Sequence, residues 1–303
     1  MLTYDFSVII PTHNRSEYLQ EAIRSIFAQQ ARVEIIVVDD ASTDSTPEIM
    51  VELAKKHSNI VSVRNESSLF AHRSRQRGFS VARGNYIVFM DDDDYYIDDS
   101  FFAVAKSVME EHAEVNSVLG STVSLCDGQY GSAIDLHGSG IISNRAYLNH
   151  FGVTYPKPDS SLTAVFRKTA LDAAGLSESK MVNDTCIYLC GILDGDVYLH
   201  NQPVATYRLH ASNISNHALP IDFVLGTLNE KIRIYKLAKK AHKLERKRAW
   251  LYHNLRVSVF YFVRTNKRDF KCLLILFFWV LLHGHGTQLN FAKHLMKTLL
   301  RIK

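Results

Sequence analysis

Cysteine is scarce in this 303-residue chain, and its few cysteines form no familiar motif. The four are Cys126, Cys186, Cys190 and Cys272, and no two of them are separated by just two residues. Zinc ribbons and thioredoxin-like redox sites need such a C-x-x-C pair, so neither class is expected. We expect buried thiols in a reducing compartment.

Long uninterrupted apolar runs are also missing. The best candidate, Cys272 to Leu282, is shorter than the roughly 20 residues of a membrane-spanning helix. Near the N-terminus, Pro11 interrupts the apolar stretch and no basic region precedes it, so we expect no signal peptide. These absences predict a cytoplasmic protein.

Neither sign of charge dominates the chain. It carries 35 Lys and Arg against 31 Asp and Glu, a net charge of +4, which is too mild to indicate nucleic acid, and we expect no such partner. The distribution is uneven, because the acidic clusters precede residue 100 and the C-terminal quarter is basic. The length and a hydrophobic content of 47% suit a globular protein of one large domain with an appendage, or of two domains.

The most informative stretch is the apolar run 86–90 followed by four consecutive aspartates, Asp91 to Asp94. The run predicts a buried strand, and the aspartates predict its exposed end. Adjacent carboxylates repel one another, and a divalent cation that takes oxygen ligands relieves this repulsion. A plain acidic turn is the alternative. An EF-hand fits poorly, because its required glycine would fall at Tyr96.

The first hundred residues alternate between expected strands and helices. Strands are expected at 6–10, 34–38, 60–63 and 86–90, with amphipathic helices between them. This order predicts an α/β fold with a mostly parallel central sheet flanked by helices. Ligands bind such sheets at the carboxyl ends of the strands. Three unusual clusters stand at these ends: residues 11–14, Asp39-Asp40 and Asp91 to Asp94. Helix capping could explain Asp39-Asp40 alone, but it explains three converging clusters poorly.

The pattern is weaker in the second half. Residues 117–161 read as short strands and polar loops, and a long irregular stretch of this kind is often functional. Asn183-Asp184 precedes an apolar helix at 186–193, and separate strands are expected at 197–199 and 204–208.

A basic helical region, 216–303, is expected to follow a first domain of residues 1–215. Helical patterns cover 225–244 and 291–303, and Lys236 to Arg248 is dense in cations. Basic amphipathic helices with aromatic residues can lie on an anionic membrane, so residues 236–303 could contact the inner face of the cell membrane. A helical hairpin with a solvated basic face is equally compatible, and the sequence leaves both interpretations open.

Three segments together resemble one known family. Residues 7–14 (SVIIPTHN), 37–44 (VVDDASTD) and 84–94 (GNYIVFMDDDD) are similar, in order and spacing, to family-2 glycosyltransferases with a GT-A fold. The resemblance covers roughly residues 5–215 and leaves out the C-terminal helices. It implies a nucleotide-sugar donor, usually UDP-linked, and a Mg2+ or Mn2+ cofactor.

The resemblance also implies roles for residues of the first two segments. The loop that contains Pro11, Thr12 and Asn14 would contact the nucleotide. Asp40, together with Asp39, would hydrogen-bond the uracil and neighbouring groups.

The next matches concern the diphosphate. Arg75 matches the arginine of the family's Arg-Asn-x-Gly motif, although Gln76 replaces the asparagine. Asp91, Asp92 and Asp93 match the Asp-x-Asp motif, with Asp93 as the best metal ligand and Asp91 as a second one. An ordinary surface arginine is the alternative for Arg75.

Two matches come from the second half. Asn183-Asp184 falls where the family has Glu-Asp, so Asp184 is the expected catalytic base despite the departure at Asn183. His210 falls where the family has a histidine near the diphosphate or the metal, and a structural histidine is the alternative.

The resemblance thus implies an inverting transferase that moves a UDP-linked hexose or N-acetylhexosamine to a hydroxyl of a glycan or lipid-linked sugar, in bacterial surface-polysaccharide synthesis. A metal-dependent nucleotidyltransferase is one alternative, but residues 11–16 lack the Gly and Lys that its loop would need. An inactive relative that binds a nucleotide sugar or a membrane partner is another, and the presence of Asp93 and Asp184 argues against it.

Overall fold

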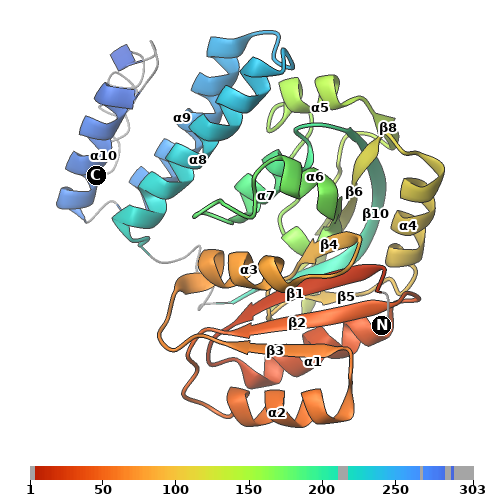
Figure 1. Cartoon of the computed structure of the whole chain (residues 1–303). Coiled ribbons are helices and arrows are strands. Elements are labelled where there is room, and N and C mark those ends of the chain that lie inside the picture. The colour runs from red at the N-terminus through yellow and green to blue at the C-terminus, as the bar shows by residue number, and fades with distance from the viewer. Residues whose placement is uncertain (1–3, 211–217, 267–268, 284–287, 290–303) are drawn as a thin grey trace. The chain divides into compact units, whose positions relative to one another are not determined.

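The computed structural model describes residues 4–210, 218–266, 269–283 and 288–289 (Figure 1). The chain divides into two compact units, Met1–Leu209 and His210–Lys303, and each is described by itself.

A ten-stranded sheet forms the centre of the first unit. Eight strands follow the order β3-β2-β1-β4-β9-β6-β10-β5, while β7 pairs with β6 and β8 with β10. The first four strands are β1 (Phe6–Thr12), β2 (Val33–Asp39), β3 (Ile60–Arg64) and β4 (Tyr86–Phe89), and their pairings with one another are parallel, as the sequence predicted.

Helices cover both faces of this parallel part (Figure 1). They are α1 (Ser16–Phe27), α2 (Thr46–Lys56), α3 (Phe70–Val81) and α4 (Phe101–Glu111). Apolar residues of α1, α2 and α4 share a core with Phe6, Val8 and Ile10 of β1. The alternate residue Ile9 faces α3, where a Cβ at Gly78 would lie 2.4 Å from its Cγ2. Gly78 therefore lets α3 lie close to the sheet.

The second half of the sheet is mixed rather than parallel. Its strands are β5 (Tyr95–Tyr96), β6 (Val115–Cys126), β7 (Gln129–Ala133), β8 (Gly140–Ile142), β9 (Ala164–Arg167) and β10 (Asp196–Leu209). β6 and β10 are parallel, but β9 is antiparallel to β4 and β6. The remaining helical segments are α5 (Asn144–His150), η1 (Ser161–Thr163), α6 (Lys168–Ala173) and α7 (Asp184–Gly191).

Two sequence expectations for this half were wrong. Residues 117–126 are part of the long strand β6 and are not irregular. The sequence did not reveal this strand because buried serines interrupt its apolar pattern. Ser117, for example, is fully buried and donates its hydroxyl hydrogen bond to the carbonyl of Gly191 at 3.0 Å. The strands expected at 197–199 and 204–208 form one strand, β10, with an irregular register against β6 between His200 and Pro203.

The second unit is helical over its described residues. It contains α8 (Ile221–Lys240), α9 (Lys247–Thr265) and α10 (Phe270–His283). The helix expected at 225–244 is α8, which begins and ends earlier. In the interior, Lys231 donates to the carbonyl of Asn254 at 2.9 Å. Measured on the described helices alone, none is both long and apolar enough to cross a membrane. The helix expected at 291–303 lies outside the described residues.

Candidate active site

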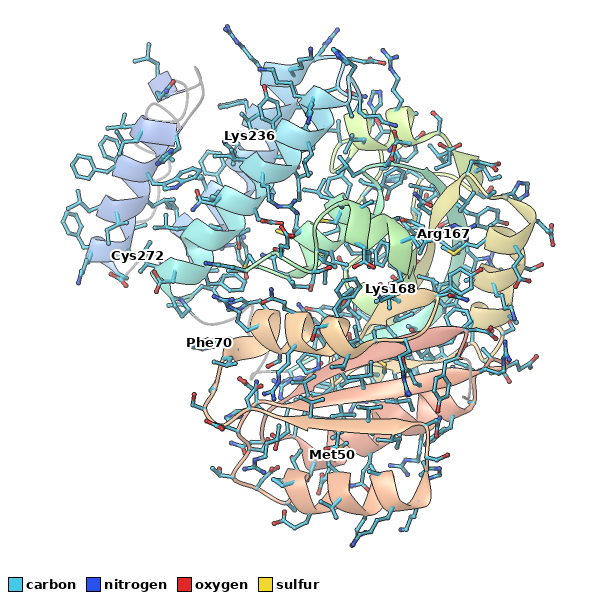
Figure 2. All side chains as sticks on the ribbon, in the orientation of Figure 1. Met50, Phe70, Arg167, Lys168, Lys236 and Cys272 are labelled. Atoms are coloured by element: carbon cyan, nitrogen blue, oxygen red, sulfur yellow. The ribbon has the colours of Figure 1, made fainter. Side chains whose placement is uncertain are left out.

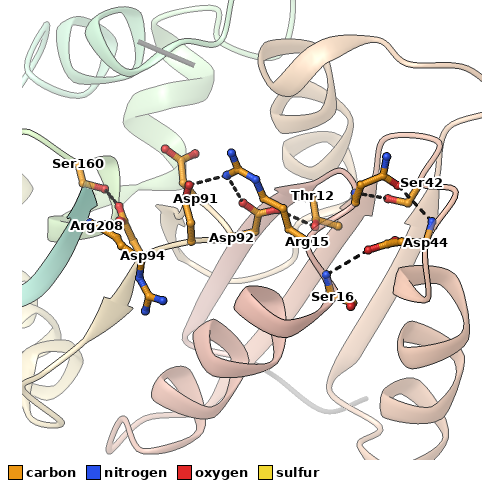
Figure 3. Close-up of polar contacts among 12 residues, drawn as sticks. Thr12, Arg15, Ser16, Ser42, Asp44, Asp91, Asp92, Asp94, Ser160 and Arg208 are labelled. Carbon is orange, nitrogen blue, oxygen red and sulfur yellow. Dashed lines mark hydrogen bonds and ion pairs between the residues drawn. The ribbon is translucent and has the colours of Figure 1, made fainter. Parts of the chain in front are cut away.

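The carboxyl ends of β1, β2 and β4 bring the three polar clusters to one edge of the sheet. The backbone N–H of Asp40 donates to the carbonyl of Thr12 at 2.8 Å, which joins β2 to β1. The hydroxyl of Thr12 donates to Asp92 Oδ2 at 2.7 Å, which joins β1 to the acidic run (Figure 3). Parallel strands of similar length explain this convergence, because their carboxyl ends meet at one edge.

Arg15 is the cation nearest to the middle of the acidic run. Its Nη1 lies 3.1 Å from Asp92 Oδ1 and 2.5 Å from Asp93 Oδ2 (Figure 3). Asp92 and Asp93 are both almost fully buried. Burial and repulsion from Asp93 outweigh Arg15 and raise the pKa of Asp92 to about 7. Arg15 was not predicted as a site residue from the sequence, although its place next to the 11–14 loop is a signal that could have paired it with the acidic run.

Arg75 joins the first aspartate of the run to the expected catalytic base. The guanidinium is buried, its Nη1 lies 3.0 Å from Asp184 Oδ1, and its Nη2 pairs with Asp91. Lys157 Nζ lies 4.0 Å from the other oxygen of Asp184. Burial raises the pKa of Asp184, but the two cations oppose it and the pKa falls below its usual value. Asp184 is thus ionised at neutral pH.

Asp94 is buried and is hydrogen-bonded within the protein. It is 1% exposed, accepts a hydrogen bond from the Ser160 hydroxyl at 2.6 Å and accepts one from the backbone N–H of Arg208 at 2.9 Å (Figure 3). Burial and the neighbouring carboxylates raise its pKa well above the usual value. Asp94 therefore joins three segments of the chain.

Both carboxylate oxygens of Asp40 accept hydrogen bonds from within the protein. Its carboxylate oxygens accept five hydrogen bonds of 2.6–3.2 Å, from Asn65, Ser68, Leu69, Phe70 and Ser74. These bonds hold Phe70 at a φ of +64°, with its side chain 58% exposed where α3 begins (Figure 2). Asp40 thus shapes the loop before α3, and its contact with a nucleotide stays a prediction.

Asp39 does offer an acceptor. Its Oδ1 accepts the backbone N–H of Ser42 at 2.8 Å. Its buried Oδ2 has no hydrogen-bond donor among the described residues, although Arg64 Nη1 lies 3.2 Å away as an ion-pair partner. A nucleobase N–H would satisfy this oxygen.

The loop after β1 is held by the loop after β2. Asn14 has a φ of +54°, and its Oδ1 accepts the backbone N–H groups of Thr43 at 2.7 Å and Asp44 at 3.2 Å. Arg15, and not Asn14, occupies the cap position of α1. Pro11 is buried within β1.

His210 follows β10 directly and is half-buried. It is the first residue of the second unit, so its approach to the carboxylates stays a prediction.

The residues fit a divalent cation that enters together with phosphate. No group of three or more His, Cys, Asp or Glu is arranged to hold a metal within the described ranges. Mg2+ commonly takes only one or two carboxylates and completes its shell with substrate phosphates and water. Five carboxylates, those of Asp91 to Asp94 and Asp184, gather here with the cations Arg15, Arg75 and Lys157. The excess of acidic groups favours a further cation.

The chain is similar to known proteins over this region. A family model described as "Glycosyl transferase family 2" matches residues 7–168. Glycosyltransferase GlyA of Streptococcus pneumoniae is 25% identical over 280 residues, which are 84% of this chain and 37% of GlyA. Poly(ribitol-phosphate) beta-N-acetylglucosaminyltransferase TarS of Staphylococcus aureus is 33% identical over 113 residues, 36% of this chain and 20% of TarS. The chain thus spans well under half of these relatives.

Solved structures show the same fold. The crystal structure of S. aureus TarS 1–349 in complex with UDP-GlcNAc matches with a TM-score of 0.68 at 20% identity, over 97% of this chain and 81% of that one. Mannosyltransferase PcManGT from Pyrobaculum calidifontis, in complex with GDP-Man and Mn2+, matches with a TM-score of 0.54 at 14% identity, over 98% and 86%. The predicted GT-A fold is confirmed by these matches.

The family model covers more than half of the residues, including the three motifs that the strand ends bring together. The chain belongs to glycosyl transferase family 2.

Proposed function

We propose that this chain transfers a sugar from a nucleotide-sugar donor, UDP-hexose or UDP-N-acetylhexosamine, to a hydroxyl of a glycan or lipid-linked acceptor. The observation that carries the proposal is the bridge of Arg75 between Asp91 and Asp184. The bridge holds the ionised carboxylate of Asp184 beside the acidic run. A transferase needs this arrangement when one carboxylate accepts the proton of the acceptor hydroxyl while the diphosphate leaves nearby. In this assignment residues 1–215 carry the reaction.

Asp184 acts as the base. Its lowered pKa keeps it ionised at neutral pH, so it can accept the proton of the acceptor hydroxyl as that oxygen attacks the sugar. A single displacement inverts the anomeric centre, because no second carboxylate forms a covalent intermediate with the sugar. An α-linked donor would therefore give a β-linked product.

The donor lies along the edge formed by β1, β2 and β4. Asp39 Oδ2 accepts a base N–H, while Pro11, Thr12, Asn14 and Asp40 shape the pocket through the contacts described above.

On the diphosphate side, Asp93 and Asp91 would hold a Mg2+ or Mn2+ ion, and Asp92 is fixed beside them by Thr12. When bound, this ion supplies positive charge to the leaving diphosphate. The Mn2+ in the structural relative PcManGT supports the choice of ion.

The relatives suggest where to begin with substrates. TarS is a poly(ribitol-phosphate) beta-N-acetylglucosaminyltransferase, and GgaB of Bacillus subtilis, 32% identical over 131 residues, is a minor teichoic acid biosynthesis protein. We infer an acceptor in bacterial surface-polysaccharide synthesis and take UDP-GlcNAc as the first donor to test.

The test is calorimetric titration with UDP, with and without Mn2+, on the wild type, Asp93→Ala and the exposed control Glu52→Ala. We expect Mn2+-dependent UDP binding that Asp93→Ala abolishes and Glu52→Ala retains. UDP binding that ignores both Mn2+ and Asp93 would refute the donor site.

Catalysis is tested separately with Asp184→Asn, which keeps the size of the side chain and removes the base. Sugar transfer or UDP-sugar hydrolysis should fall by about 10² to 10⁴ while UDP affinity changes little. Turnover of nucleoside triphosphates in place of UDP-sugars would favour the nucleotidyltransferase. UDP-sugar binding without turnover of any donor would favour the inactive relative.

We further propose that residues 236–303 contact an anionic membrane surface, on the cytoplasmic side where nucleotide sugars are made available. Large apolar side chains of α10 are exposed: Phe270, Leu274, Phe278, Leu281 and Leu282. Residues 216–303 carry 18 Lys and Arg against four Asp and Glu. Exposed apolar side chains on a cationic unit suit an anionic lipid surface better than plain solvent.

A further inference from the structure

The guanidinium of Arg15 lies between two carboxylates of the proposed metal site. Its Nη1 contacts Asp93 Oδ2 at 2.5 Å and Asp92 Oδ1 at 3.1 Å, and the Arg15 side chain is only 22% exposed (Figure 3). Asp93 is the residue to which we assign the metal. Arg15 therefore contacts the oxygens that a cation would need.

The two carboxylates are held in different ways. Thr12 holds the second oxygen of Asp92 at 2.7 Å, so Asp92 keeps a protein partner if Arg15 moves away. Arg15 contacts Asp93 directly, and a divalent cation at this carboxylate would lie close to the guanidinium. The guanidinium and a divalent cation would repel each other strongly if both contacted Asp93, so Arg15 and a metal compete for this carboxylate.

The backbone of Arg15 is fixed, so a displacement must come from its side chain. The neighbouring Asn14 donates its backbone N–H to Ser42 Oγ at 2.9 Å and accepts the N–H of Thr43 at 2.7 Å. On the other side α1 begins at Ser16. A long flexible side chain on an anchored backbone can change partners without a movement of the loop.

We propose that Arg15 holds the Asp93 carboxylate in the free protein and transfers to the diphosphate of the donor when the metal and the donor bind. This inference rests on the proposed function. A displaced arginine needs another anion, and the diphosphate brings one whose oxygens match its forked donors. Metal and nucleotide then bind cooperatively, because each favours the state in which Arg15 has left Asp93.

A permanent structural ion pair is the competing explanation. In that case the removal of Arg15 takes an ion-pair partner from Asp93 and makes the protein less stable, but there is no cooperativity to lose. The two explanations differ in the affinity for metal when no nucleotide is present.

The experiment measures Mn2+ binding without nucleotide, from the electron paramagnetic resonance signal of free Mn2+, on the wild type, Arg15→Met and Arg24→Met. Arg24 is an exposed arginine of α1 that bonds only to the carbonyl of its own helix residue Gln20 in the described contacts, so it serves as the matched control. We expect Arg15→Met to bind Mn2+ about tenfold more tightly than the other two, since it removes one charged competitor.

A second titration measures UDP at saturating Mn2+. Arg15→Met should bind UDP about tenfold more weakly than the wild type does. The two proteins should bind uridine equally, because uridine has no phosphate for Arg15 to contact. Arg15→Lys keeps the charge and should lie between the two. Unchanged Mn2+ affinity in Arg15→Met, with a normal thermal unfolding curve, would overturn the inference and leave the donor site intact. Failure of the wild type to bind UDP with Mn2+ would overturn both.

Discussion

Replacement of Arg75 by methionine is the most informative perturbation of this protein. Arg75 is 5% exposed and pairs with two carboxylates that belong to different segments, Asp91 after β4 and Asp184 at the start of α7. Arg75→Met keeps the apolar stem and removes the charge. It leaves two acidic groups facing each other without the cation between them.

The magnitude follows from burial. Removal of one partner from a buried ion pair costs about 3–5 kcal/mol. The side chains of Asp91 and Asp184 are 33% and 31% exposed, so solvent screens part of this cost. We expect Arg75→Met to lower the free energy of unfolding by roughly 2–4 kcal/mol at neutral pH.

Equilibrium unfolding in urea, followed by circular dichroism, measures this loss. The double variant Arg75→Met/Asp184→Asn removes one of the two unpaired charges and should regain about 1 kcal/mol or more relative to Arg75→Met. Arg24→Met, on the exposed side of α1, is the control. A loss below about 1 kcal/mol in Arg75→Met, or a double variant no more stable than the single one, would contradict the assigned electrostatic bridge.

Three further predictions test other parts of the molecule. Gly84→Ala should destabilise the protein by about 1–3 kcal/mol in the same urea assay, because its Cβ would lie 2.5 Å from the backbone carbon of Phe6. Burial opposes the charged form of Asp40, but the hydrogen bonds to its carboxylate outweigh burial and lower its pKa in the folded protein. The ionised Asp40 therefore stabilises the fold fully above the pKa of the unfolded chain, about 4, and this contribution is lost as the pH falls through the lower pKa of the folded protein. In acid titrations the stability advantage of the wild type over Asp40→Asn should shrink below about pH 4. Replacement of both Phe270 and Phe278 by serine should weaken co-sedimentation with vesicles of anionic lipid at least tenfold, whereas Val51→Ser, which changes an exposed valine of α2, should not; equal binding of both variants would contradict the membrane proposal.

The sequence predicted the first half of the fold well because its signals are local. Residues 6–10, 34–38 and 86–90 are mostly apolar runs, interrupted at Ser7 and Glu34, that end in polar clusters, and buried parallel strands have this pattern. The parallel order then follows from the helices between the strands. The convergence of Thr12 and Asp92 at one edge of the sheet needed no further information.

The second half could not be predicted in the same way, because its strands contain buried polar residues. Ser117, Ser121 and Thr122 of β6 are almost fully buried, and a strand with such residues has no clear period in its hydrophobic pattern. Pairing of β6 with the distant β10 supplies what the local pattern lacks. The antiparallel direction of β9 is set by its pairing with β4 and β6, and only the folded chain brings these strands together.

Among the cations of the site, Arg15 was the hardest to foresee, whereas Arg75 was expected from its match to the family's Arg-Asn-x-Gly motif. Four adjacent aspartates suggest a metal by themselves, since a run of like charges needs compensation. In the folded protein Arg15 and Arg75 supply part of that compensation from the loop after β1 and from α3. A sequence shows the acidic run directly, but the arginines that neutralise it come from segments whose approach depends on the sheet order. Acidic groups outnumber the arginines that pair with them, so on the proposed function a donor that brings both a metal and a diphosphate would supply the remaining cation of the site.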